Sequence, residues 1–156
     1  VIFFEHKALY RSVSELVPDE YYEIEICKAK HIKAGEDFSI ITYGAGVHWA
    51  LEFQQKNPSY SIDIIDLRTL LPLDYDAVQS SVMRTGKVIL FHEDTLIGGI
   101  GGEIAAWFSE NCFQYLDAPV MRCASLDTPI PFNIQLEKNF MANTRLGEVV
   151  EKLLSF

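Results

Sequence analysis

The chain has 156 residues, of which 49% are apolar and 22% are charged, and its 13 Lys and Arg against 22 Asp and Glu give a formal net charge of −9. This length and apolar content indicate one folded domain, or one domain with an arm, and exclude a disordered chain. The negative charge repels a polyphosphate, so we expect no nucleic-acid partner. No apolar run approaches the ~20 residues of a membrane span, so we expect no membrane partner either.

The first residues indicate that the chain is a piece of a longer polypeptide. It opens without a methionine in an apolar run with high strand propensity, Val1 to Phe4. An isolated domain seldom begins in the middle of a strand. The following stretch, VPDEYYEIE, is acidic, contains Pro18 and lacks a 3.6-residue apolar stripe. Residues 1–36 therefore read as an arm, with a possible strand at its start and an extended connector after it.

From residue 37 onward, strand and helix patterns alternate. Short runs of β-branched and aromatic residues predict strands at 38–43, 61–66, 87–91 and 119–124. Helical spacing predicts helices at 47–57, at 74–84, from the glycine-rich turn 98–102 to about 112, and at 144–154. Asp74 is placed to cap the second helix and Gly86 to end it. This alternation predicts an α/β sandwich with a mostly parallel sheet.

The carboxyl ends of the strands are where open α/β sheets bind ligands. One such end carries His92, Glu93 and Asp94. A histidine beside two carboxylates suits proton transfer, so His92 and Glu93 are the candidate catalytic residues. The same pattern is also consistent with a histidine that bonds locally at the strand end and an exposed glutamate. No complete active site is evident from the residues.

Other motifs indicate neither a cofactor nor a metal site. The Gly98–Gly102 cluster lacks the third glycine of a dinucleotide fingerprint, and Glu103 would repel a phosphate. The cluster favours a tight turn that starts a helix against the sheet. No GxSxG elbow is present, and His48 has no partner four residues on, as a helical metal site would require.

The cysteines indicate a reducing compartment. Cys27, Cys112 and Cys123 are odd in number and lack CxxC spacing. They are expected to be reduced, mostly buried thiols of a cytoplasmic protein.

Several ordered segments resemble one family. The chain contains, in order, FEHKALYR, IDLRTLLPLD, FHEDTLIGGIGGEIA and YLDAPVMRCASLDTPIPF, and ends with an amphipathic helix and Phe156. Over essentially its whole length it resembles the carboxyl-terminal half of the beta subunit of thiamine-diphosphate-dependent 2-oxoacid dehydrogenases. That half is related to the transketolase carboxyl-terminal domain.

This resemblance implies a three-layer α/β/α sandwich with a mostly parallel sheet of five strands. Residues 1–36 would be the end of a preceding pyrimidine-binding domain plus a linker, and residues 37–156 the transketolase C-terminal-like domain. The whole enzyme would decarboxylate a 2-oxoacid and pass the acyl group to a lipoyl arm. Thiamine diphosphate and magnesium would be held by other parts of that enzyme, so this chain would bind no cofactor and would be inactive alone.

The resemblance also implies partners and their contact residues. The partners would be an alpha subunit or alpha-like region, a second beta subunit, and the subunit-binding domain of the dihydrolipoyl acyltransferase. In relatives, the acyltransferase docks on the acid of an L-[DE]-A-P motif and on the chain-terminal carboxylate, which here correspond to Asp117 and Phe156. Asp117 is equally consistent with a turn residue before Pro119.

Three readings of function remain open at this stage. The first is the dehydrogenase domain just described, with CFQYLDAPVMRCASLDTPIP favouring branched-chain over pyruvate relatives. The second is the carboxyl-terminal domain of a transketolase or deoxyxylulose-phosphate synthase, which has no lipoyl partner. The third is a free-standing α/β binding module.

Overall fold

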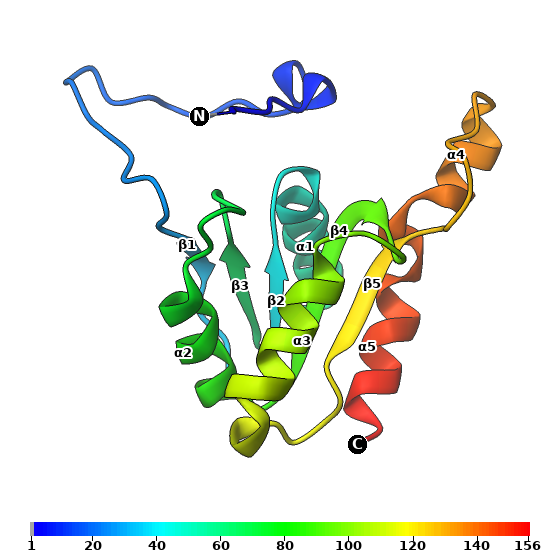
Figure 1. Ribbon diagram of the computed structural model, residues 1–156. Helices are drawn as coiled ribbons and strands as arrows, with labels where there is room; N and C mark the ends of the chain where they lie inside the picture. The colour runs from blue at the N-terminus through cyan, green and yellow to red at the C-terminus, as the bar shows by residue number, and fades with distance from the viewer. Residues whose placement is uncertain (1) are drawn as a thin grey trace.

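The computed structural model describes residues 2–156, which form a five-stranded sheet with helices on both faces (Figure 1). The strand order is β1-β3-β2-β4-β5. Strand β1 pairs antiparallel with β3, and the other neighbours are parallel. The predicted five-stranded, mostly parallel sheet is confirmed. The strands are β1 (Lys30–Lys33), β2 (Phe38–Thr42), β3 (Ile62–Asp66), β4 (Val88–Thr95) and β5 (Met121–Ser125).

Helices cover both faces of the sheet, which confirms the three-layer sandwich. Helices α1 (Ala45–Lys56) and α5 (Leu146–Leu154) pack on one face. Helices α2 (Tyr75–Thr85) and α3 (Gly101–Asn111) pack on the other. A short helix, α4 (Ile134–Phe140), follows β5, and three 3₁₀ turns complete the fold: η1 (Lys7–Tyr10), η2 (Phe113–Tyr115) and η3 (Ala142–Arg145).

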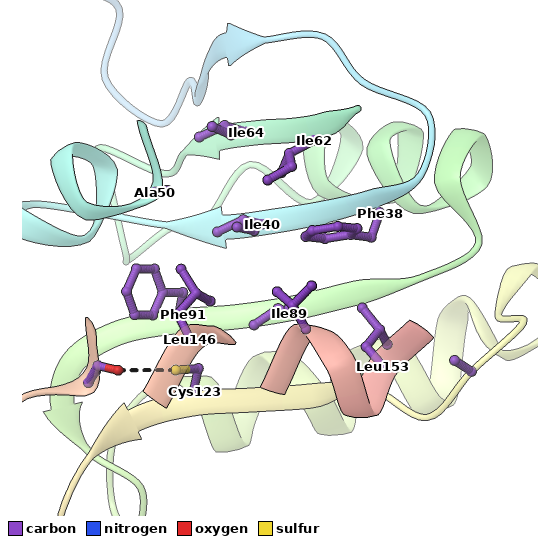
Figure 2. Packing of buried hydrophobic residues seen from close by; sticks show 13 residues of the cluster. Phe38, Ile40, Ala50, Ile62, Ile64, Ile89, Phe91, Cys123, Leu146 and Leu153 are labelled. Atoms are coloured by element: carbon purple, nitrogen blue, oxygen red, sulfur yellow. Dashed lines mark hydrogen bonds between the residues drawn. The ribbon is translucent and has the colours of Figure 1, made fainter. Parts of the chain in front are cut away.

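The sheet is buried on both sides because parallel strands joined by crossover helices leave no solvated face. All five residues of β2 are buried. Alternate residues of β2, β3 and β4 meet α1 and α5 in one apolar cluster, and the thiol of Cys123 donates a hydrogen bond of 3.4 Å to the Ala142 carbonyl there (Figure 2). The intervening residues meet α2 and α3 in a second cluster, which holds Cys112.

The predicted limits of α2 are confirmed in detail. The Asp74 carboxylate accepts a hydrogen bond from the Ala77 amide, as a helix cap does. Its other oxygen accepts from the Ala29 amide at 3.0 Å, which ties the segment before β1 to α2. Gly86 ends the helix in the left-handed conformation at φ 65°.

Two elements were missed by the sequence analysis. Strand β1 lies inside the range interpreted as a connector, and its residues KHIK are mostly exposed, so no apolar alternation marks it. Helix α4 buries only Phe140, so it carries no apolar stripe. The possible strand at the start of the chain is wrong for residues 2–4, which have no regular structure, and Val1 lies outside the described residues.

The two ends of the described chain lie on opposite sides of the sheet, one beyond the carboxyl ends of the parallel strands (the carboxyl edge) and one beyond their amino ends. In Figure 1 the arm, drawn in blue, runs beyond the carboxyl ends of β2 and β3, whereas α5 ends at the opposite edge. Within residues 2–156, no helix is both long and apolar enough to cross a bilayer.

Candidate functional site

His92 and Glu93 are adjacent near the carboxyl end of β4, but their side chains have different surroundings, as strand alternation requires. The His92 ring stacks on Tyr43, with ring centroids 6.3 Å apart, and the residue is 2% exposed. Its Nδ1–H donates to the Asp94 carbonyl at 3.2 Å, which leaves Nε2 as an acceptor without a partner among the described residues. Burial lowers the pKa of His92, so the ring is neutral at pH 7.

The glycine-rich turn packs directly against this histidine. A β-carbon at Gly101 would lie 2.4 Å from His92 Nε2, and one at Gly99 would lie 2.7 Å from Cε1. Gly101 is also the first residue of α3. The interpretation of this cluster as a tight turn that starts a helix against the sheet is confirmed. The buried imidazole explains the glycines at 99 and 101, and the positive φ of 82° explains Gly98.

Glu93 faces the arm. Its carboxylate lies 2.8 Å from Nε2 of His6, and its side chain is 40% exposed. His92 and Glu93 therefore do not face a common space, which favours structural roles. A catalytic role for either residue stays a prediction.

The carboxyl edge of the sheet is hollowed beside Glu93. A cleft of about 470 Å³, which we call the carboxyl-edge cleft, lies between the ends of β2 and β4 and the segment from β5 to α4. Carboxylates and apolar side chains both line it: Glu93, Asp94 and Glu137 on the one hand, and Tyr43, Ile130, Phe140 and Met141 on the other. Burial raises the pKa of Tyr43, and the negative charges of Asp94 and Glu93 raise it further.

These residues do not suit the cofactor implied by the resemblance. The diphosphate of thiamine diphosphate would meet three carboxylates in the cleft and no Lys or Arg side chain among its described lining residues. Within residues 2–156, no group of three or more His, Cys, Asp or Glu is arranged to hold a metal ion, and His48 in α1 belongs to no such group. We therefore assign no cofactor chemistry to this edge.

Asp117 lies at the opposite edge, in the connection between η2 and β5. Its amide donates to the Gly86 carbonyl at 2.7 Å, so its backbone belongs to a turn. The residue is exposed, and its carboxylate accepts no hydrogen bond from residues 2–156 but packs over Gly86, where a β-carbon would lie 2.1 Å from Oδ2. The Asp117 side chain therefore contacts Gly86 and still leaves its negative charge open to solvent.

A second hollow, which we call the edge groove, adjoins Asp117. It measures about 780 Å³ and lies between α3 and the segment leading into β5, the last strand of the sheet. Its wall on α3 is built from small residues, and its rim carries the 74% exposed ring of Phe113. The small residues are Gly102, Ala105, Ala106 and Ser109.

Phe156 follows α5 at the same edge of the sheet. Its side chain is 61% exposed, whereas Leu153 one turn earlier is fully buried. The buried stripe fixes the last turn of α5 and leaves the terminal residue accessible. The roles of Asp117 and Phe156 in binding stay predictions.

The most elaborate polar cluster was not anticipated from the sequence. The fully buried carboxylate of Asp63 in β3 bonds to His31 of β1 and to Arg84 of α2, both at 2.5 Å. Ser81 donates to the same carboxylate. The pattern SIDIID places Asp63 in a strand with alternating polar residues, which could have signalled it, but its partners lie far away in the sequence.

The thiols are mostly buried, as predicted. All three cysteines are free; Cys112 and Cys123 are buried and Cys27 is half-buried. Burial raises the pKa of Cys123 to about 12.

The amino-acid sequence matches one family model and several named proteins. The family model for the transketolase C-terminal domain matches residues 27–145. The chain is 43% identical over 146 residues to the 2-oxoisovalerate dehydrogenase subunit beta of Bacillus subtilis, covering 92% of this chain and 45% of the relative. It is 40% identical over 154 residues to the pyruvate dehydrogenase E1 component subunit beta of Staphylococcus aureus, covering 97% of this chain and 46% of the relative.

A solved structure shares the architecture. It is described as a split gene transketolase, an inactive beta4 tetramer, and it matches with a TM-score of 0.73 and 26% identity over 92% of this chain and 46% of that one. The chain therefore spans less than half the length of these relatives.

Proposed function

Because this chain belongs to the transketolase C-terminal domain family, we propose that it works as the carboxyl-terminal domain of the beta subunit of a 2-oxoacid dehydrogenase. The beta subunits of two such dehydrogenases match it over more than nine tenths of its length. The whole enzyme would decarboxylate a 2-oxoacid on thiamine diphosphate and transfer the acyl group to a lipoyl arm. The chain alone would be inactive, because it would bind neither that cofactor nor magnesium.

The substrate we propose is a branched-chain 2-oxoacid. The identity to the 2-oxoisovalerate enzyme, 43%, exceeds the 40% found with the pyruvate enzyme. The segment CFQYLDAPVMRCASLDTPIP, which contains β5, favours the same choice. The residues that would contact the substrate belong to other parts of the enzyme, which we propose to be cytoplasmic.

The role of this domain would be assembly with an alpha subunit and a second beta subunit, and docking of the acyltransferase core. The observation that carries docking is the carboxylate of Asp117. It is exposed, lacks a hydrogen-bond partner within residues 2–156, and lines the edge groove next to the exposed ring of Phe113. A cation of the acyltransferase subunit-binding domain would pair with this carboxylate while apolar side chains enter the groove. The terminal carboxylate of Phe156 would supply a second anionic contact.

Charge supports this partner. The net charge of −9 attracts a basic domain, and pairs formed at the rim of an interface speed association and fix its register. Docking of this kind weakens as salt screens the charges.

A calorimetric titration of the chain with the subunit-binding domain of its own acyltransferase, at low and at moderate salt, tests the proposal. We expect saturable binding whose affinity falls as salt increases. The same titration is repeated with the assembled alpha and beta subunits, because the docking surface could include the neighbouring subunit. Absence of binding in both titrations would contradict the docking role.

A transketolase is the second candidate, because a solved transketolase shares the fold at 26% identity. A transketolase transfers a two-carbon unit between sugar phosphates and needs no lipoyl partner. Assays of the assembled enzyme with 2-oxoisovalerate and with a ketose phosphate separate the two candidates.

A further inference from the structure

The carboxyl-edge cleft lies at the edge of the sheet remote from Asp117, so the docking proposal leaves it unexplained. Three of its lining residues are carboxylates, namely Glu93, Asp94 and Glu137, and no Lys or Arg side chain within residues 2–156 lines it. At about 470 Å³ it falls within the range of pockets that hold small groups, about 300–1,000 Å³. An anionic hollow of this size selects a cationic occupant.

The bonds of the three carboxylates leave part of this charge uncompensated. Glu93 is next to a histidine, His6 of the arm, at 2.8 Å. One oxygen of Asp94 accepts a hydrogen bond from the Thr95 amide at 2.8 Å. The carboxylate of Glu137 is half-buried and accepts no hydrogen bond from the described residues. The carboxylate of Glu137 and the second oxygen of Asp94 are therefore left to pair with a bound cation.

The spacing of the carboxylates suits an organic cation better than a metal ion. Among residues 2–156, no three acidic or histidine side chains converge closely enough to hold a metal. The cleft also has apolar walls, formed by Phe140 and Met141, and an aromatic side chain, Tyr43. A guanidinium group is planar and weakly hydrated, bonds carboxylates in a forked arrangement and packs on aromatic faces, so it fits such walls better than an ammonium group.

The surroundings of the cleft indicate that this cation belongs to a polypeptide. The segment that forms one wall continues into side chains that are almost entirely in solvent. Ile130 and Ile134 are each 67% exposed, and Phe132 is fully exposed. Exposed apolar side chains on one segment beside a cleft favour a protein interface, because a small free cation would leave them uncovered.

We propose that the carboxyl-edge cleft receives an arginine side chain of a partner polypeptide, with apolar neighbours of that arginine covering Ile130 and Phe132. Glu137 and Asp94 bind the guanidinium, and Tyr43, Phe140 and Met141 contact its alkyl stem. This site is separate from the docking surface at Asp117, so either assignment can fail while the other stands.

Three probes test the proposal by NMR titration of the chain. They are the capped tripeptide Leu-Arg-Leu, the same tripeptide with citrulline in place of arginine, and agmatine. Citrulline has nearly the shape of arginine without its charge. We expect the arginine peptide to shift the amide signals of Tyr43, Glu93 and Glu137 saturably and to bind more tightly than agmatine, while the citrulline peptide has little effect.

Two variants locate the binding. Glu137→Gln keeps the shape of the side chain and should weaken binding of the arginine peptide about fivefold. Glu110→Gln, at the exposed end of α3, is the matched control and should leave the affinity unchanged. Thermal unfolding of both variants checks that the fold is retained.

Several outcomes would overturn the proposal. Equal binding of the arginine and citrulline peptides would show that charge is not recognised. Tighter binding of agmatine than of the arginine peptide would identify a small free cation as the ligand. Absence of saturable shifts, or an unchanged affinity in Glu137→Gln, would remove the site altogether.

Discussion

The imidazole of His92 occupies the space that a side chain at Gly101 would need, since a β-carbon at Gly101 would lie 2.4 Å from Nε2. The buried histidine and the glycine-rich turn therefore form one packing unit. This unit lets α3 begin directly against β4, and it places the unprotonated Nε2 beside the positive end of that helix.

A side chain at Gly101 should accordingly be costly. We expect Gly101→Ala to lower the free energy of unfolding by about 1–3 kcal/mol, the usual cost of forcing a methyl group into a packed site. The matched control is Gly147→Ala in α5, where a β-carbon meets nothing within 4 Å. That change should stabilise the protein by about 0.5–1 kcal/mol. Urea denaturation measures both, and equal effects of the two substitutions would contradict the packing.

Burial of His92 should make stability depend on pH. Its folded pKa is lowered by burial, with Arg122 contributing and Asp94 opposing, so the unfolded chain takes up the proton at a higher pH than the folded chain. The stabilisation is complete above the unfolded pKa of about 6.5 and declines as the pH falls below it. Each unit of pKa difference contributes about 1.4 kcal/mol.

The comparison of the chain with its His92→Gln variant isolates this effect from the other three histidines. Urea denaturation at several pH values between 7.5 and 5 (roughly the range in which histidine titrates) gives the slope of the unfolding free energy against pH for each protein. We expect a smaller loss of stability on acidification in the variant. Identical slopes would mean that His92 titrates equally in the folded and unfolded chains.

The sequence predicted the elements that bury apolar residues in a regular pattern. Strands β2 to β5 and helices α2 and α5 follow such patterns, and the cap at Asp74 follows from local chemistry. Strand β1 was not predicted because it is charged and exposed, and because its pairing with β3 depends on residues about thirty positions away. Helix α4 escaped because six of its seven residues are not buried.

The candidate sites were only partly accessible from the sequence for the same reason. The pattern identified His92 and Glu93 as neighbours in the chain. It could not show that the His6 ring contacts the Glu93 carboxylate or that Gly101 packs against Nε2 of His92. Both contacts join segments distant in the sequence. Asp117 was singled out through family resemblance, and the edge groove beside it became visible only in three dimensions.

The buried carboxylate of Asp63 should matter for stability, because it joins β1 and α2 to the centre of the sheet. Asp63→Asn keeps the shape but removes the charge that faces Arg84 and His31, each roughly 40% exposed on its side chain. We expect a loss of about 1–3 kcal/mol in the free energy of unfolding, less than for a fully buried pair because water reaches both partners of the carboxylate. Asp19→Asn in the exposed arm serves as control and should change little. Equal stability of the two variants would assign no role to the cluster.

The three thiols should differ in reactivity. Burial raises the pKa of Cys123 to about 12 and also raises that of Cys112, so neither forms a thiolate near neutral pH. Cys27 is half-buried and should be the one that reacts with Ellman's reagent in the native protein at about pH 8. The Cys27→Ser variant should lose this reaction, and denaturing urea should expose the other two. Fast reaction of more than one thiol in the native chain would contradict the buried positions.

Docking at Asp117 makes a final prediction that separates the partner from the fold. Asp117→Asn removes the exposed charge without changing the amide that bonds Gly86, so thermal stability should be retained while affinity for the acyltransferase subunit-binding domain falls about tenfold. Removal of Ser155 and Phe156 should weaken docking in a similar way, because it moves the terminal carboxylate to Leu154.

Asp76→Asn in the first turn of α2 is the matched control for the loss of one negative charge. If all three variants dock equally, general attraction by the acidic surface explains the affinity and Asp117 has no specific role. If only the control retains full affinity, the salt dependence of the two weakened variants should also be shallower, since each has lost one ion pair.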